Sequence, residues 1–151
     1  MPTAGAELSR TIGSHLGEVR DLVAKVRLFL DQHTGNPDLC QRTEIVLAEL
    51  LNNIVEHAYR EEGAGRITLR IVLCETGVRI LTEDTGDPVP GGVLPEGLLP
   101  ATDGSLSSLP EGGFGWFLLR NLAHDLSYER DADTNRIRLT LPYSGDSKPN
   151  T

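Results

Sequence analysis

Glu49 and Asn53 stand four residues apart in the stretch AELLNNIVEHAY and could do chemistry on a phosphorylated ligand. On a helix, residues at this spacing project from one face. A carboxylate there could orient or deprotonate a nucleophile, and the carboxamide offers one oxygen to Mg²⁺, a hard ion that prefers oxygen ligands. Taken alone, the pair is more simply explained as the solvated face of an amphipathic helix.

A second cluster, Asp84-Thr85-Gly86-Asp87-Pro88, follows an apolar strand. The Asp84 carboxylate could accept a hydrogen bond from an exocyclic amine such as adenine N6. Gly86 has no Cβ, so the backbone there could come close to a flat base. A plain Asp-x-Gly turn at the end of a strand is the alternative explanation, and it is about as common.

The third cluster is the glycine turn Gly112-Gly113-Phe114-Gly115, which precedes an apolar helix. Free N–H groups at the start of a helix, in a turn without side-chain bulk, can bind an anion, although many such turns bind nothing. A P-loop is excluded because the chain has no GxxxxGK[ST] motif. In this order, with a Pro/Gly/Ser-rich loop between the second and third, the three clusters predict a pocket for Mg-ATP.

Other polar and aromatic residues near these clusters have less certain roles. His57, one helical turn after Asn53, could approach the phosphates or be a partly buried helix residue. Trp116 and Phe117 are expected to make core or lid contacts, and Arg120 to lie on the surface.

The totals describe an ordinary globular chain. Its 151 residues suggest a single domain, 1–151, which can bury a real core. A net charge of -8 argues against nucleic-acid binding, which needs a basic surface, but suits a protein partner with a basic surface. Cys40 and Cys74 lack metal-site or disulfide spacing, so both are expected to be thiols in a reducing compartment. With neither a signal peptide nor a long apolar run, the chain is expected to be cytoplasmic and not membrane-bound.

Periodicity predicts an α+β fold, a two-layer sandwich of an antiparallel or mixed sheet with helices on one face. The expected helices are 16–32, about 37–59 and 115–122, and the expected strands are 7–12, 67–73, 78–83, 125–130 and 136–141. Residues 131–135 are expected to be the turn between the last two strands. Residues 87–111 have no periodicity and many Pro and Gly residues, which predicts a functional lid or, alternatively, a passive insertion.

At these residues the chain resembles a known family. AELLNNIVEHAY, EDTGDP and EGGFGWFLLRNLAHDLSY are similar to the N box, G1 box and G2 region of the GHKL ATPase superfamily, which includes gyrase, histidine kinases and anti-sigma-factor serine kinases. The match to the last group is the closest, and the closing NRIRLTLP also resembles its last strand. The likeness covers about residues 7–142 and implies a Bergerat-type ATP-binding fold.

The resemblance also implies residue roles. Glu49 would be the general base and Asn53 the Mg²⁺ ligand, while Asp84 would bind adenine N6 with Gly86 beneath the base. Gly113 and Gly115 would donate backbone N–H groups to the phosphates. Many relatives use a Thr after a Gly at the start of the last strand to hold adenine. In this chain Thr134 and Asn135 stand in that place.

The function that the resemblance implies is that of an ATP-dependent serine/threonine protein kinase acting as an anti-sigma factor. Such a protein would bind a sigma factor and phosphorylate a STAS-type anti-anti-sigma antagonist, and its first strand and helix could form a homodimer. An ATP-gated binding module without phosphotransfer is one alternative. The catalytic part of a histidine kinase is another, although the chain is too short to add a dimerising phospho-acceptor domain.

Overall fold

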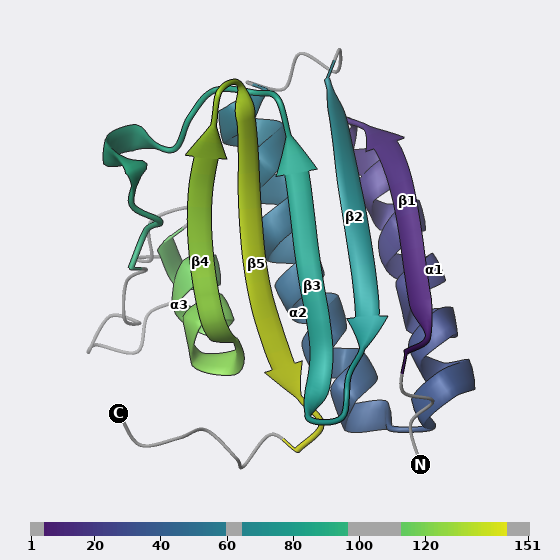
Figure 1. Cartoon of the computed structure of the whole chain (residues 1–151). Coiled ribbons are helices and arrows are strands. Elements are labelled where there is room, and N and C mark those ends of the chain that lie inside the picture. Colours follow the sequence, from purple (N-terminus) through teal and green to yellow (C-terminus); the bar gives the residue numbers. More distant parts are fainter. Residues whose placement is uncertain (1–4, 60–64, 97–112, 145–151) are drawn as a thin grey trace, which may run out of the picture.

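The computed structural model describes residues 5–59, 65–96 and 113–144. Five strands form one antiparallel sheet in the order β1-β2-β3-β5-β4, and the α-helices of the described residues all lie against one face of it (Figure 1). The predicted α+β sandwich is therefore confirmed, with an antiparallel sheet. The strands are β1 Glu7–Gly13, β2 Arg66–Leu73, β3 Gly77–Asp84, β4 His124–Asp131 and β5 Thr134–Pro142.

Alternation along the strands assigns their two faces. In β2 the odd-numbered residues from Ile67 to Leu73 are buried under the helices, while Arg66 and Arg70 face the uncovered side. The helices supply the other half of the core through residues spaced three and four apart, such as Leu47, Leu50 and Leu51. The core thus lies between one face of the sheet and α1 (Leu16–Thr34), α2 (Pro37–Asn53) and α3 (Gly113–Leu122).

Local signals fix where the first two helices end and begin. Gly35 adopts a left-handed conformation, with φ of 57°, and ends α1. The Asn36 side chain then caps α2 by accepting a hydrogen bond from the Leu39 N–H at 3.1 Å, and Pro37 fills the first turn. This start of the second helix was predicted correctly.

The second helix reaches about Tyr59, as predicted, but its last turn is not α-helical. The α-helix ends at Asn53 and continues as a π-helical turn, η1 (Ile54–Ala58), closed by the Tyr59 N–H on the Ile54 carbonyl. Single π turns are rare in proteins, and those that occur are often found at functional sites. Here the turn directs the Ala58 carbonyl toward the Asp87 N–H, 2.8 Å away, so the helix end is bonded to the loop that follows β3.

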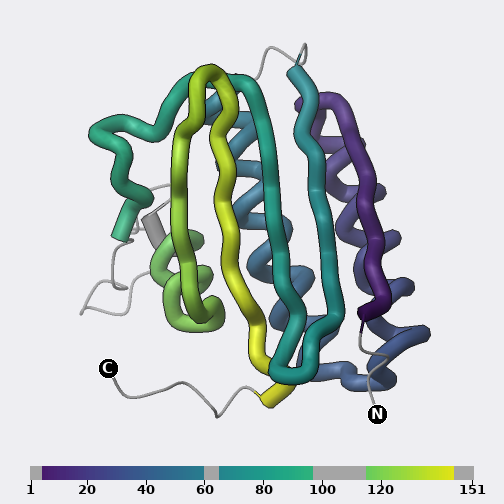
Figure 2. Tube along the Cα trace, viewed as in Figure 1, coloured from purple at the N-terminus to yellow at the C-terminus, as the bar shows by residue number. Residues whose placement is uncertain are grey.

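The segment after β3 runs past the end of β4 before it returns toward α3 (Figure 2). The whole of 87–111 was expected to be structureless. Residues 87–96 are not, because Pro90–Gly92 form a 3₁₀ turn, η2, and Leu94 is buried. The rest of the expected lid, 97–111, lies outside the described residues. The last turn is shorter than predicted, since only Ala132 and Asp133 separate β4 from β5.

Cys40 is buried and Cys74 half-buried, and both are free thiols, as expected. Within the described ranges, no helix has the length and apolar character needed to cross a membrane.

Candidate functional site

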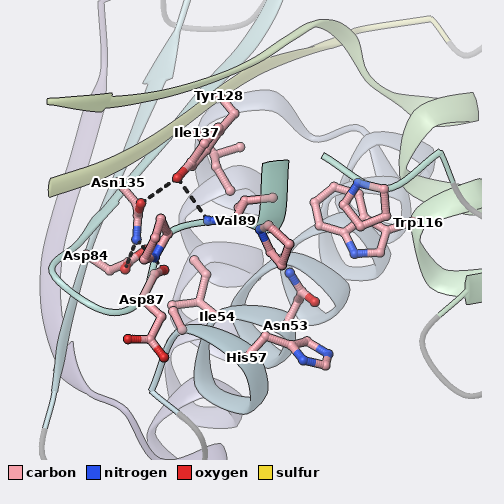
Figure 3. Close-up of a pocket in the computed structure, with 14 residues that line it drawn as sticks. Asn53, Ile54, His57, Asp84, Asp87, Val89, Trp116, Tyr128, Asn135 and Ile137 are labelled. Carbon is pink, nitrogen blue, oxygen red and sulfur yellow. Dashed lines mark hydrogen bonds between the residues drawn. The ribbon is translucent and has the colours of Figure 1, made fainter. Parts of the chain in front are cut away.

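A cavity of about 730 Å³ opens between α2–η1, the ends of β3, β4 and β5, the segment after β3, and α3. Its volume is in the range of small-molecule sites. The residues that line it are Asn53, Ile54, His57, Ala58, Asp84, Asp87, Pro88, Val89, Pro90, Pro95, Trp116, Tyr128, Asn135 and Ile137. Figure 3 shows Asp84, Asn135 and Tyr128 together at one end, with Asn53 and His57 farther along toward Trp116.

Of the residues singled out from sequence, Asn53, His57, Asp84 and Asn135 line this one cavity. The structure therefore brings together side chains from a helix and two strands that are up to 82 positions apart in the sequence. The partial burial considered for His57 is wrong, because its side chain is 68% exposed. An exposed imidazole at the cavity rim is free to approach a ligand.

Gly86 packs so closely against the π turn that no side chain would fit at this position. A Cβ at this position would lie 2.5 Å from the Ala58 carbonyl oxygen and 2.7 Å from the Ala58 Cβ. Its φ is not positive, so close approach, rather than backbone conformation, requires glycine here. The glycine in the second cluster thus lets the helix end and the strand end touch beside the cavity.

Asp84 and Asn135 form a buried polar pair across β3 and β5. They stand opposite each other in the strand register and are 4% and 3% exposed. Asn135 Nδ2 donates to Asp84 Oδ1 at 2.8 Å, and the Gly86 N–H donates to the same oxygen at 2.9 Å. Burial raises the pKa of the Asp84 carboxyl, while these two hydrogen bonds and the positive charge of Arg130 act in the opposite direction.

Two residues of β4 complete this network. The Tyr128 hydroxyl donates to Asn135 Oδ1 at 2.6 Å and accepts the Val89 N–H at 3.1 Å. Arg130 Nη1 donates to the same Asn135 oxygen and to the Gly86 carbonyl, both at 2.9 Å. Neither residue was predicted from the sequence, although alternate positions of β4 carry Leu126, Tyr128 and Arg130 on the face toward the helices.

Arg120 fixes the far end of the cavity wall. Its Nε donates to the Pro95 carbonyl at 2.7 Å and its Nη2 donates to the Leu94 carbonyl at 2.9 Å. The expectation that Arg120 lies on the surface is therefore wrong, because the side chain is half-buried and bonded to a loop 25 residues away. With Tyr128 on Val89, it holds the segment 89–95 in place from both ends.

Glu49 does not line the cavity; it lies one helical turn before Asn53, with an exposed side chain. It packs against α3 at Gly115, where a Cβ would lie 2.5 Å from the carboxyl carbon of Glu49. Gly115 is buried, and Gly113 is the first residue of α3. The first and third clusters are therefore in contact, as a common site requires.

Trp116, expected in the core or the lid, is buried and also lines the cavity. Among the described residues, no group of three or more His, Cys, Asp or Glu side chains could hold a metal ion.

A family model for the histidine kinase-like ATPase domain matches residues 12–141. The chain belongs to this family. The match includes all three clusters and every strand except most of β1, of which it covers only the last two residues, and the last residue of β5. Membership of this family implies that the chain uses a nucleotide.

Relatives of this chain include proteins named as protein kinases. It is 28% identical to the serine-protein kinase RsbW of Bacillus subtilis over 110 residues, 72% of this chain and 68% of that protein. RsbW of Bacillus velezensis is 27% identical over 104 residues, 68% of this chain and 64% of that protein. The serine/threonine-protein kinase BtrW of Bordetella bronchiseptica is 35% identical over 95 residues, 61% of this chain and 63% of that protein. The matched part therefore spans about two thirds of these relatives.

Proposed function

We propose that this chain is an ATP-dependent serine/threonine protein kinase that acts as an anti-sigma factor. It would bind a sigma factor and transfer the γ-phosphoryl group of ATP to a Ser or Thr of a STAS-type anti-anti-sigma protein. The proposal is supported by the names of its relatives, by the resemblance of the three clusters, and by the site that the clusters form.

The observation that carries the proposal is the contact between Glu49 and Gly115. It holds a carboxylate beside the first turn of α3, where backbone N–H groups without helical partners can bind phosphate. In our proposal Gly113 and Gly115 donate these N–H groups. The Glu49 carboxylate would then accept the proton of the partner's hydroxyl as it attacks the γ-phosphorus, so this chain needs no nucleophile of its own.

Asn53 is the proposed Mg²⁺ ligand. Its carboxamide lines the cavity one turn from Glu49, and an amide oxygen suits a hard cation that completes its shell with phosphate oxygens and water. When bound, Mg²⁺ would neutralise charge on the phosphates. His57, at the same rim, is proposed to contact the phosphates, and Asp84, with Gly86 and Asn135, to bind the adenine.

Calorimetric titration with ADP and a non-hydrolysable ATP analogue, with and without Mg²⁺, tests the pocket. We expect magnesium-dependent binding that Asn53→Ala abolishes. Asn52→Ala is the matched control, because Asn52 is the adjacent residue of the same type and does not line the cavity. Binding that Asn53→Ala leaves unchanged would contradict the ligand assignment, and no binding at millimolar nucleotide would contradict the pocket.

Phosphotransfer to a STAS-domain protein then tests the kinase reaction. Glu49→Gln keeps the shape of the side chain but cannot accept a proton, so it should lose transfer by about 10²–10⁴-fold. Glu56→Gln, on the neighbouring exposed turn, should transfer phosphate as the wild type does. Full transfer by Glu49→Gln would show that the base assignment is wrong, and no transfer by the wild type would favour an ATP-gated binding module.

A further inference from the structure

A chain of hydrogen bonds joins the cavity wall to the buried carboxylate, and its donor directions are fixed. The Val89 N–H can only donate, so the Tyr128 oxygen accepts that hydrogen bond. The Tyr128 hydroxyl then donates its own proton to Asn135 Oδ1. Arg130 can only donate to that same oxygen. The Nδ2 of Asn135 must then point to acceptors, which are Asp84 Oδ1 at 2.8 Å and the Asp87 carbonyl at 2.9 Å.

This arrangement leaves one oxygen of Asp84 available. Among the described residues, both hydrogen bonds that the carboxylate accepts go to Oδ1, from Asn135 and from the Gly86 N–H. Oδ2 receives neither, and Asp84 lines the cavity. The two donors on Oδ1 fix the orientation of the carboxyl group and favour its ionised form, in which both oxygens can only accept. A ligand group at Oδ2 must therefore be a donor.

We infer that Asn135 and Tyr128 are positioning residues that make this site select a 6-amino purine over a 6-oxo purine. The exocyclic amine of adenine donates to Oδ2, whereas the oxygen of hypoxanthine would face the carboxylate with its own lone pairs. Asn135 contributes a direct hydrogen bond to Asp84, and Tyr128 fixes the orientation of Asn135. The inference rests on the proposed nucleotide site and adds what sets its base preference.

The Tyr128 bond to Val89 ties this selectivity to the cavity wall. Val89 and the adjacent Pro90 line the cavity, and Arg120 holds the same segment at Leu94 and Pro95. Displacing the wall at Val89 would remove the donor that orients Tyr128. The geometry at the base end of the site therefore depends on the wall at Val89 as well as on the Asp84 carboxylate.

Titration of the full chain with ADP and with IDP tests the inference, since the two ligands share ribose and phosphates and differ only in the base. The quantity compared is the ratio of the Kd for IDP to the Kd for ADP. A hydrogen bond to a charged group changes affinity by about 10- to 100-fold, so the wild-type ratio should lie in that range. Thermal unfolding of each variant checks that it folds.

Tyr128→Phe removes one hydroxyl and should lower the ratio by about three- to tenfold, the effect of one neutral hydrogen bond. Asn135→Ala should lower it further. Tyr59→Phe is the matched control: its hydroxyl also accepts a backbone N–H, that of Thr85 at 2.8 Å, but contacts neither Asn135 nor Asp84. It should keep the wild-type ratio even if it is less stable. A variant of Asn135 that fails to fold leaves Tyr128→Phe to decide.

Each outcome is decisive. A wild type that binds ADP and IDP equally, or a Tyr128→Phe variant with an unchanged ratio, would overturn the inference while leaving the nucleotide site intact. An equal fall in the ratio for Tyr59→Phe would also overturn it, because the effect would then be a general loss of structure. A wild type that binds neither ligand would overturn both this inference and the proposed function.

Discussion

Gly115→Ala asks whether the Glu49 carboxylate must lie where α3 holds it. A Cβ at position 115 would lie 2.5 Å from the Glu49 carboxyl carbon and 3.2 Å from its Cγ. Reaching ordinary van der Waals separations requires the carboxyl group to move by at least about 1 Å, since its Oε2 would lie closer to the new Cβ than the carboxyl carbon does. Because the Glu49 side chain is exposed, it can turn away without disturbing the core.

The substitution should therefore separate stability from activity. Alanine is favoured over glycine in a helix by about 0.5–1 kcal/mol, which corresponds to a rise in Tm of roughly 1–4 °C. Phosphotransfer should fall by about 10²-fold, the effect of misplacing a reacting group by about 1 Å. Nucleotide affinity should change little, because the backbone N–H of residue 115 is retained.

The assay is phosphate transfer from ATP to a STAS-domain protein under single-turnover conditions, with thermal unfolding and calorimetry on the same samples. Gly17→Ala is the matched control, since it adds a Cβ to the exposed face of α1 with nothing within 4 Å. It should show the gain in stability alone. Wild-type transfer by Gly115→Ala would refute the reasoning, because the carboxylate would then work from a displaced position.

Two further predictions concern stability. Burial raises the pKa of the Asp84 carboxyl above its ordinary value of 3.8, so the wild type loses stability as pH rises from about 3.8 through the raised pKa, and stays less stable above it. Asp84→Asn cannot ionise and should become more stable relative to the wild type across that interval, while losing ADP affinity; thermal unfolding against pH checks this, and a constant difference would contradict it. Asn36→Ala removes the cap on Leu39 and the bond from Asn36 Nδ2 to the Tyr143 carbonyl at 3.1 Å. It should lower the free energy of unfolding by about 1–2 kcal/mol and Tm by roughly 2–8 °C, with ADP affinity unchanged, and a loss of affinity would show that the cap also supports the site.

Residues with a local signal could be found from the sequence. Asn36-Pro37 predicted the start of α2, and Asp84 and Gly86 were recognised because they lie at the end of an apolar strand. Helix spacing was enough to place Glu49 and Asn53 on one face. In each of these cases the signal lies in residues close together in the sequence, although Asp84 and Gly86 have partners, Asn135 and Ala58, on other elements.

Tyr128, Arg130 and Arg120 had no such signal. Their partners lie on other elements: Tyr128 reaches Val89, 39 residues away, and Arg120 reaches Pro95, 25 residues away. The register of β4 on β5 places Arg130 opposite Asn135. The sequence of β4 alone does not predict that register. Such residues need the three-dimensional pairing of strands before their chemistry can be recognised.

Close approach at a glycine is not by itself a sign of function, and three positions in this fold show why. At Gly77 an added Cβ would meet the backbone of Leu141 on the neighbouring strand β5, and neither residue lines the cavity. At Gly86 it would meet the carbonyl of the π turn beside Asp84, and at Gly115 it would meet the carboxylate of Glu49. The informative observation is therefore which group lies against the glycine. A strand neighbour indicates packing, whereas a carboxylate brought against the start of a helix is an arrangement that packing does not require and that the proposed phosphate site would explain.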